Sequence, residues 1–141
     1  MTKVTDVVLE TFRAVECRDR EGLLALYHPQ VEFHEAPSLP YGGTLRGKEE
    51  VARNGGWIET WGPLQPTEAE RGMDPRVIAA HDREVVVLYH QRALNRAGEH
   101  FDAPVLGLYE VRDGKFARAQ MFHYDTAAVV DFLARAQLRA A

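Results

Sequence analysis

The sequence contains a single cysteine, Cys17, among its 141 residues. One cysteine cannot form a disulfide within the chain, so a disulfide-stabilised secreted scaffold is excluded and a reducing compartment is favoured. The first residues, MTKVTDVVLE, lack the apolar core of a signal peptide, and no later run is long and apolar enough to cross a membrane. We therefore expect a soluble, cytoplasmic protein with no membrane partner.

The chain also lacks a concentration of positive charge and the common cofactor motifs. Its formal net charge is −4, and no segment matches a nucleic-acid-binding motif. Glycine-rich phosphate loops, G-x-S-x-G elbows and Glu-x-x-His pairs are missing, and the neighbours His34 and Glu35 are not a metal-ligand motif. The sequence therefore predicts no nucleic-acid partner, no metal and no cofactor.

Apolar residues are plentiful and make up 45% of the chain. A chain of this length and composition buries one sizeable core. No repeat, low-complexity tract or linker divides it, so we expect a single domain over residues 1–141.

Hydrophobic periodicity predicts helices near the N-terminus and mostly strands after them. The expected elements, in chain order, are a helix at 5–17, a short helix between Asp19 and Pro29, a strand at 31–36, a bend at Gly42-Gly43, a helix at 48–61 interrupted by Gly55-Gly56, a weaker strand at 67–72, strands at 76–80 and 84–94, and a hairpin followed by a helix over 101–133. Asp113-Gly114 is a typical hairpin turn, and Asp125-Thr126 is a typical helix start. This order predicts an α+β fold in which a curved, mostly antiparallel sheet wraps around the N-terminal helices as a cone.

Three segments resemble a known family. PYGGTLRGKEEV, VRDGKFARAQMFHYD and DTAAVVDFL are similar to segments of SnoaL-like proteins in the nuclear transport factor 2-like superfamily. The resemblance extends from about Val4 to Leu133. That superfamily includes ketosteroid isomerase, limonene epoxide hydrolase, scytalone dehydratase and polyketide cyclases, so the resemblance implies the cone-shaped fold and leaves the reaction open.

The resemblance also suggests roles for individual residues. It places Glu35 at the position of the isomerase's catalytic base. The isomerase's oxyanion-hole tyrosine and aspartate correspond to Thr11 and Gly107, neither of which can do that work, so a steroid isomerase of that type is not expected. Arg92 and Asp125 match two parts of the epoxide hydrolase's Asp-Arg-Asp site. Asp125 or Asp102 is nearest to the acidic residue of the cyclases.

Strand alternation bears on Glu35 independently. If Val31 and Phe33 face the interior, Glu35 does so too. An apolar environment disfavours the charged carboxylate, raises its pKa and makes it a usable base near neutral pH. The alternative is a glutamate at the rim of the cone, paired with Arg46 or left in solvent.

His123 and Asp125 end the last strand. The resemblance directs His123 to the pocket beside Met121 and Asp125, with Phe122 and Tyr124 outside. An imidazole there can relay a proton or polarise a carbonyl, whereas a histidine hydrogen-bonded inside the sheet would be structural. Asp125 has its own alternative as the N-cap of the last helix.

Two further pairs keep alternative interpretations. His90 and Arg92 share one face of the strand at 84–94, which either lines the cone or, if Val85, Val87 and Tyr89 point inward, lies outside. Trp57 and Trp61 lie four residues apart and form either core or the wall of a ligand pocket.

These observations predict a cofactor-independent enzyme of the isomerase, cyclase or dehydratase type that acts on a small hydrophobic carbonyl compound by general acid/base chemistry. Glu35 would be the base, with His123 or His90 stabilising an enolate. The alternatives are a module that binds a hydrophobic ligand without transforming it, and an epoxide hydrolase, which requires Arg92 between two inward carboxylates. We also expect a homodimer formed through the outer face of the sheet.

Overall fold

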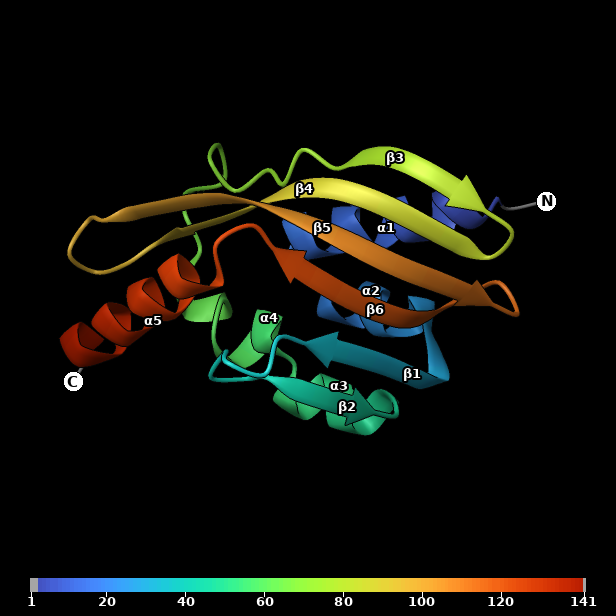
Figure 1. The fold of residues 1–141 in the computed structure, drawn as a ribbon, viewed down its shortest axis with the longest axis horizontal. Coiled ribbons are helices and arrows are strands. Elements are labelled where there is room, and N and C mark those ends of the chain that lie inside the picture. The colour runs from blue at the N-terminus through green and yellow to red at the C-terminus, as the bar shows by residue number, and fades with distance from the viewer. Residues whose placement is uncertain (1–2, 141) are drawn as a thin grey trace.

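The computed structural model describes the backbone of residues 3–140, and the side chains of these residues except 58–59 and 137–140. Its central element is an open, curved sheet of six strands (Figure 1). The strands are β1 (Tyr27–Glu35), β2 (Gly43–Arg46), β3 (Arg76–His81), β4 (Glu84–Leu94), β5 (His100–Arg112) and β6 (Lys115–His123). Their order across the sheet is β2-β1-β6-β5-β4-β3. Neighbours are antiparallel except β1 and β6, which run parallel. The predicted α+β architecture is confirmed.

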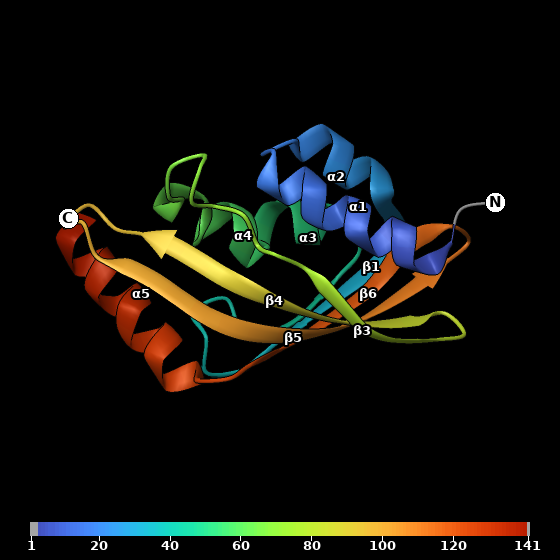
Figure 2. The same ribbon diagram turned by 90° about the horizontal axis from the view of Figure 1, so that it is seen from above.

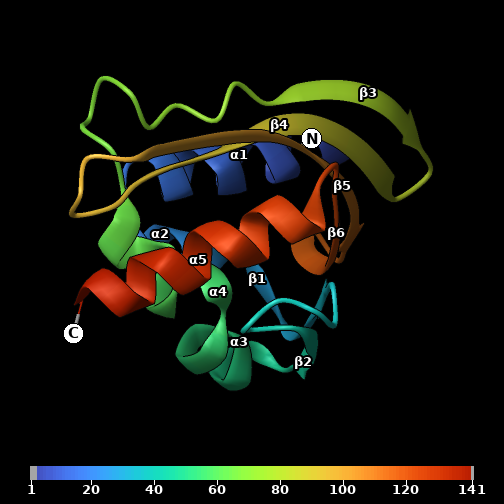
Figure 3. The ribbon, with the colours of Figure 1, turned by 60° about the vertical axis from the view of Figure 1, so that its left-hand side comes forward.

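The helices lie against the concave face and one end of this sheet. They are α1 (Val4–Glu16), α2 (Arg20–Leu26), α3 (Lys48–Asn54), α4 (Gly56–Glu59), the 3-10 turn η1 (Gly62–Leu64) and α5 (Thr126–Ala140). Figure 2 shows α1 to α4 on the same side of the strands. Figure 3 shows α5 crossing the end of the sheet, between the β4–β5 end and the α3–β2 region. No described helix is long and apolar enough to span a membrane.

The main core lies between α1 and strands β4, β5 and β6. The buried stripe of α1 includes Val8 and Phe12, and the Phe12 ring packs edge-on against Tyr89 and Tyr109 at centroid distances of 5.0 and 5.8 Å. A second cluster forms where Phe132 of α5 stacks on Trp61. Burial of such a side chain stabilises the fold by roughly 1.5–3 kcal/mol. A space remains between the two clusters.

Local sequence signals determine the element boundaries around the last strand. Asp113 and Gly114 both have positive φ, 54° and 70°, as a two-residue hairpin turn of type I′ requires. The Asp125 side chain accepts a hydrogen bond from the Ala128 backbone N–H at 3.0 Å and thereby caps α5. Both predictions are confirmed. β6 therefore ends at His123, directly before the start of α5.

β1 begins at Tyr27, before the Pro29 at which the second helix was expected to end, and β2 follows the expected bend. Two predicted elements are broken or absent in the structure. The helix expected at 48–61 is broken at Gly55, whose extended backbone separates α3 from α4. The strand expected at 67–72 is absent, because the Thr67 carbonyl accepts hydrogen bonds from the backbone of Glu70 and Arg71 and the segment turns. Both departures lie in the segment that covers the open side of the sheet.

Candidate functional site

A cavity of about 100 Å³ lies between the helices and the concave face of the sheet. Its wall is mostly apolar and aromatic, with side chains from α1, β1, α4, β4, β5 and β6. The lining residues used below are Thr11, Tyr27, Glu35, Tyr41, Trp57, Trp61, Tyr89, Gln91, Tyr109, Met121 and His123. We call this space the inner cavity. Trp57, Trp61 and Met121, expected as pocket residues, all lie in its wall.

Glu35 is the last residue of β1 and points into the inner cavity. Val31 and Phe33 are buried, so the strand alternation that directs them inward also directs Glu35 inward. Its carboxylate makes no hydrogen bond or ion pair with any described residue. Burial raises its pKa from 4.5 to about 7. The alternative partner, Arg46, instead binds Glu32 at 2.8 Å on the opposite face of the strand.

His123 is the last residue of β6 and also lines the inner cavity. Both of its ring nitrogens are buried, and neither has a hydrogen-bond partner in the described part of the chain. Burial lowers the pKa of the imidazole, so the ring is neutral at neutral pH. A neutral imidazole offers one N–H donor and one acceptor nitrogen, and here both are available to a ligand.

Four tyrosines in the wall were not predicted as site residues. Burial raises the pKa of Tyr27, Tyr41, Tyr89 and Tyr109, and the negative charge of Glu35 raises each pKa further. Their hydroxyls therefore stay protonated and lie within electrostatic reach of the carboxylate. The available signal was the alternation that makes Tyr89 and Tyr109 inward residues of β4 and β5; Tyr41 lies in a turn, where no periodicity exists to find it.

The Tyr109 hydroxyl occupies the space that a side chain at position 107 would fill. A Cβ built on Gly107 would overlap this hydroxyl and lie 2.5 Å from a ring carbon of the same tyrosine. The two residues are separated by two positions on β5 and so share a face. The sequence resemblance aligns position 107 with the isomerase's aspartate, and the space beside Gly107 is occupied by the Tyr109 hydroxyl. Thr11, the other corresponding residue, donates its hydroxyl proton to the Val8 carbonyl at 2.6 Å.

Tyr41 is held by Trp61 and Gly56. The Trp61 indole N–H donates to the Tyr41 hydroxyl oxygen at 2.7 Å. Because an indole N–H only donates, the Tyr41 oxygen is the acceptor and its own proton has no acceptor among the described residues. A Cβ on Gly56 would lie 2.5 Å from the Tyr41 ring, so this glycine makes room for the tyrosine. The Gly55-Gly56 pair that breaks the helix thus also positions a hydroxyl donor.

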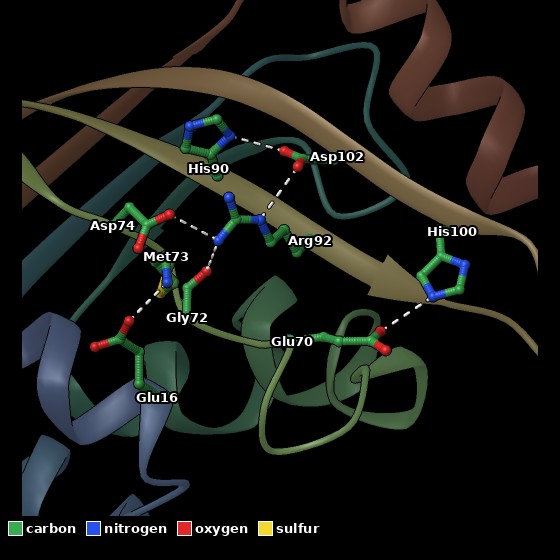
Figure 4. A network of polar contacts seen from close by, with 9 residues as sticks. All are labelled: Glu16, Glu70, Gly72, Met73, Asp74, His90, Arg92, His100 and Asp102. Carbon is green, nitrogen blue, oxygen red and sulfur yellow. Dashed lines mark hydrogen bonds and ion pairs between the residues drawn. The ribbon is translucent and has the colours of Figure 1, made fainter.

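His90 and Arg92 lie outside the inner cavity. Val85, Val87 and Tyr89 are buried on the concave face, so the intervening residues of β4 point away from it. His90 Nδ1 lies 2.8 Å from Asp102 Oδ1, and Arg92 binds Asp102 and Asp74 at 3.2 and 2.9 Å (Figure 4). The two aspartate side chains are 51% and 67% exposed. The role predicted for His90 beside Glu35 does not fit this placement.

The same placement bears on the epoxide-hydrolase alternative. That reaction requires Arg92 between two inward carboxylates, and both of its carboxylates point to solvent. Asp125 is not in the inner cavity's wall either, because it caps α5. Among the side chains that the structure describes, no three of His, Cys, Asp or Glu gather closely enough to hold a metal ion. The groups inside the cavity that can do chemistry are therefore a carboxylate, an imidazole and tyrosine hydroxyls.

A second, larger cavity of about 450 Å³ adjoins the inner one. We call it the outer cavity. The two share six lining residues: Val15, Leu23, Trp57, Trp61, Met73 and Gln91. Most of the outer cavity's other lining residues are polar or charged, including Glu16, Arg18, Asp19, Arg20, Arg71 and Arg92. Together the cavities provide a volume in the range of small-molecule sites, about 300–1,000 Å³.

A cone of this kind with an apolar interior is what the resemblance to known proteins predicted. The sequence-family model of the SnoaL-like domain matches residues 8–119 of the chain. The chain belongs to the SnoaL-like domain family. The match covers β1 through most of β6 and so includes Glu35, Tyr41 and Tyr109.

Solved structures show the same fold at low sequence identity. The SnoaL-like chain described here is 21% identical to TerC crystallised with polyporic acid, with 93% of this chain and 98% of that one covered and a TM-score of 0.76. It is 22% identical to an NTF2-like protein of unknown function from Burkholderia pseudomallei (94% and 98% covered, TM-score 0.77). It is 24% identical to an NTF2-like protein from Burkholderia thailandensis (93% and 97% covered, TM-score 0.72). None of the curated proteins compared with the chain matches it.

Proposed function

We propose that this protein is an enzyme that abstracts a proton next to the carbonyl group of a small hydrophobic compound, with Glu35 as the base. The observation that carries this proposal is an unpartnered carboxylate in an apolar cavity, with its pKa raised to about 7. A base whose pKa lies near the working pH is both ionised and strong enough to take a proton. Ion pairing would lower that pKa, and Glu35 has no ion-pair partner among the side chains that the structure describes.

The second requirement is a donor for the carbonyl oxygen. The Tyr41 hydroxyl has an unused proton, because its oxygen accepts from Trp61. His123 adds a neutral imidazole with no partner. In the proposed reaction the proton moves from the carbon next to the carbonyl to the Glu35 carboxylate. The electron pair of the broken C–H bond forms the enolate, whose oxygen accepts a hydrogen bond from Tyr41 or His123.

The later fate of the enolate defines the overall reaction. Return of the proton to a different carbon gives isomerisation, attack on a second carbonyl gives aldol cyclisation, and loss of a hydroxyl group gives dehydration. All three begin with the same proton abstraction. TerC, which has the same fold, was crystallised with the organic compound polyporic acid. This likeness of fold supports the proposal that the protein takes an organic ligand.

The experiment measures proton abstraction directly and needs no knowledge of the product. The protein is incubated in D₂O with a panel of hydrophobic aryl and cyclic ketones, and deuterium incorporation next to the carbonyl is followed by NMR. We expect incorporation by the wild-type protein and a decrease of about 100-fold or more in Glu35→Gln, as for loss of a general base. The rate of the wild type should rise as pH increases through about 7, where Glu35 ionises.

Glu32→Gln is the matched control. Glu32 lies on the same strand as Glu35, and its carboxylate binds Arg46 and His34 outside the cavity. This variant should exchange deuterium at the wild-type rate. If ketones quench the fluorescence of Trp57 and Trp61 but no deuterium enters them, the protein is a binding module and the proposed function is wrong.

A further inference from the structure

The outer cavity has a surplus of positive charge in a protein whose net charge is negative. Four arginines and two acids line it, namely Arg18, Arg20, Arg71, Arg92, Glu16 and Asp19. The formal net charge of the whole chain is −4. A cavity of opposite sign to the protein attracts anions and repels cations.

The two acids in this wall are already used. Glu16 Oε2 accepts a hydrogen bond from the Met73 backbone N–H at 2.6 Å (Figure 4). Asp19 Oδ1 accepts one from the Gly22 backbone N–H at 2.9 Å and caps α2. Neither acid forms an ion pair with an arginine of the described chain. These carboxylates therefore hold the backbone in place and do not neutralise any arginine of the wall.

Of the four arginines, Arg92 is paired and Arg71 is not. Arg92 binds Asp74, Asp102 and the Gly72 carbonyl. The Arg71 guanidinium makes no hydrogen bond or ion pair with any side chain or backbone group that the structure describes, and its Nε is buried without a partner among them. Leaving a buried donor unsatisfied costs free energy, and the cost is larger for a charged group. Arg18 makes one hydrogen bond with the described residues, from Nη2 to the Gly62 carbonyl at 3.3 Å. Its other N–H groups can therefore donate to a ligand.

The size of the inner cavity brings a ligand to these arginines. About 100 Å³ is less than the roughly 150 Å³ of a cavity that holds benzene. A ligand whose carbonyl reaches Glu35 must therefore extend past Trp57 and Trp61 into the outer cavity. There its exposed end meets Arg71 and Arg18.

We propose that the ligand carries a carboxylate, which Arg71 binds in the outer cavity with help from Arg18 while the apolar carbonyl end occupies the inner cavity. The planar guanidinium matches a carboxylate with two parallel hydrogen bonds. The placement of the carbonyl end rests on the proposed function, whereas the carboxylate subsite does not. The substrate class is then a hydrophobic keto acid.

The test compares a keto acid whose carbonyl end is small, 5-oxohexanoate, with its methyl ester, which lacks the negative charge and carries one additional methyl group. Both tryptophans of the chain line both cavities, so quenching of their fluorescence reports binding. We expect the acid to bind at least 10-fold more tightly than the ester, and added NaCl to weaken only the acid. Arg71→Gln should reduce acid affinity about 10-fold or more, to the level of the ester, and leave the ester unchanged.

Two further variants separate charge from folding. Arg71→Lys keeps the charge and should retain part of the preference for the acid. Arg83→Gln removes an exposed arginine in the β3–β4 turn, outside both cavities, and should change neither affinity. Equal affinity for acid and ester in the wild type, no quenching by the acid, or an equal loss of both affinities in Arg71→Gln would overturn the proposal.

The same samples distinguish this inference from the proposed function. Binding that prefers the acid, without deuterium incorporation, supports the carboxylate subsite and contradicts the enzyme. Deuterium incorporation at the same rate into acid and ester, with equal affinities, supports the enzyme and contradicts the subsite.

Discussion

The two faces of the sheet hold ionisable side chains in opposite ways. On the outer face, His90, Arg92 and Asp102 bind one another, and Glu32 binds Arg46 and His34. On the inner face, neither Glu35 nor His123 has a polar partner among the described side chains. Outside, partners hold Asp102 and Glu32 in their charged forms, and hydrogen bonds to His90 and His34 help to lower their pKa values. Inside, burial favours the neutral form of both groups. An ionisable side chain left without a partner in an apolar space is the stronger indication of a ligand site.

The largest expected difference between the faces is in stability above neutral pH. Folded Glu35 binds its proton more tightly than unfolded Glu35, so the free energy of unfolding decreases as pH rises from about 4.5 to about 7. At pH 8 we expect the free energy of unfolding of Glu35→Gln to exceed that of the wild type by about 2–3 kcal/mol. At pH 5 the two free energies should be nearly equal. Urea denaturation at the two pH values measures this.

Glu32 on the outer face should behave in the opposite sense. A hydrogen bond from His34 is the main cause of its lowered pKa, and the Arg46 charge adds to it. Glu32 therefore contributes stability above its unfolded pKa and loses it as pH falls. Glu32→Gln should be slightly less stable than the wild type at pH 8. If Glu35→Gln destabilises the protein at pH 8 as well, the inner carboxylate is not in an apolar environment.

A packing effect of intermediate size is expected at Gly107 on the inner face. An alanine there would overlap the Tyr109 hydroxyl, and overpacking of this kind typically costs 1–3 kcal/mol. Tyr109→Leu removes the hydroxyl together with the two ring carbons that would also overlap the alanine Cβ, so Gly107→Ala should cost less in that background. A double-mutant cycle should give a coupling free energy of about 1 kcal/mol between the two positions. Additive effects would mean that Tyr109 does not occupy the space of the missing side chain.

The smallest effect is expected from the outer network. Asp102→Asn weakens contacts with His90 and Arg92. The Asp102 side chain is half exposed. Exposed ion pairs contribute about 0–1 kcal/mol, and thermal unfolding should register a change in that range. Deuterium exchange into ketones should be unaffected. A large loss of exchange in Asp102→Asn would place the outer network in the reaction.

Much of the fold and part of the candidate site followed from local patterns. Strand alternation directed Glu35 inward, because Val31 and Phe33 leave little choice of face. It could not orient β4, since both faces of Val85–Leu94 carry apolar residues, and only the packing of α1 against Tyr89 resolves this. The break at Gly55 and the role of Tyr41 depend on contacts between segments that no single periodicity describes. The homodimer stays a prediction, and the exposed Leu106 and Phe122 on the outer face are the residues with which to test it.

The parallel pairing of β1 with β6 has a consequence for how the protein is made. Phe33 pairs with Ala119, so strands from the first and last thirds of the chain must meet before the inner cavity has walls. Contacts so distant in sequence form slowly, because a long loop must close first. A ribosome-bound chain that ends before β6 exposes the apolar inner side of β1 and presents an unpaired strand edge, both of which favour aggregation. Glu35 is synthesised early, but its apolar surroundings, and with them its raised pKa, are completed only when the last strand arrives.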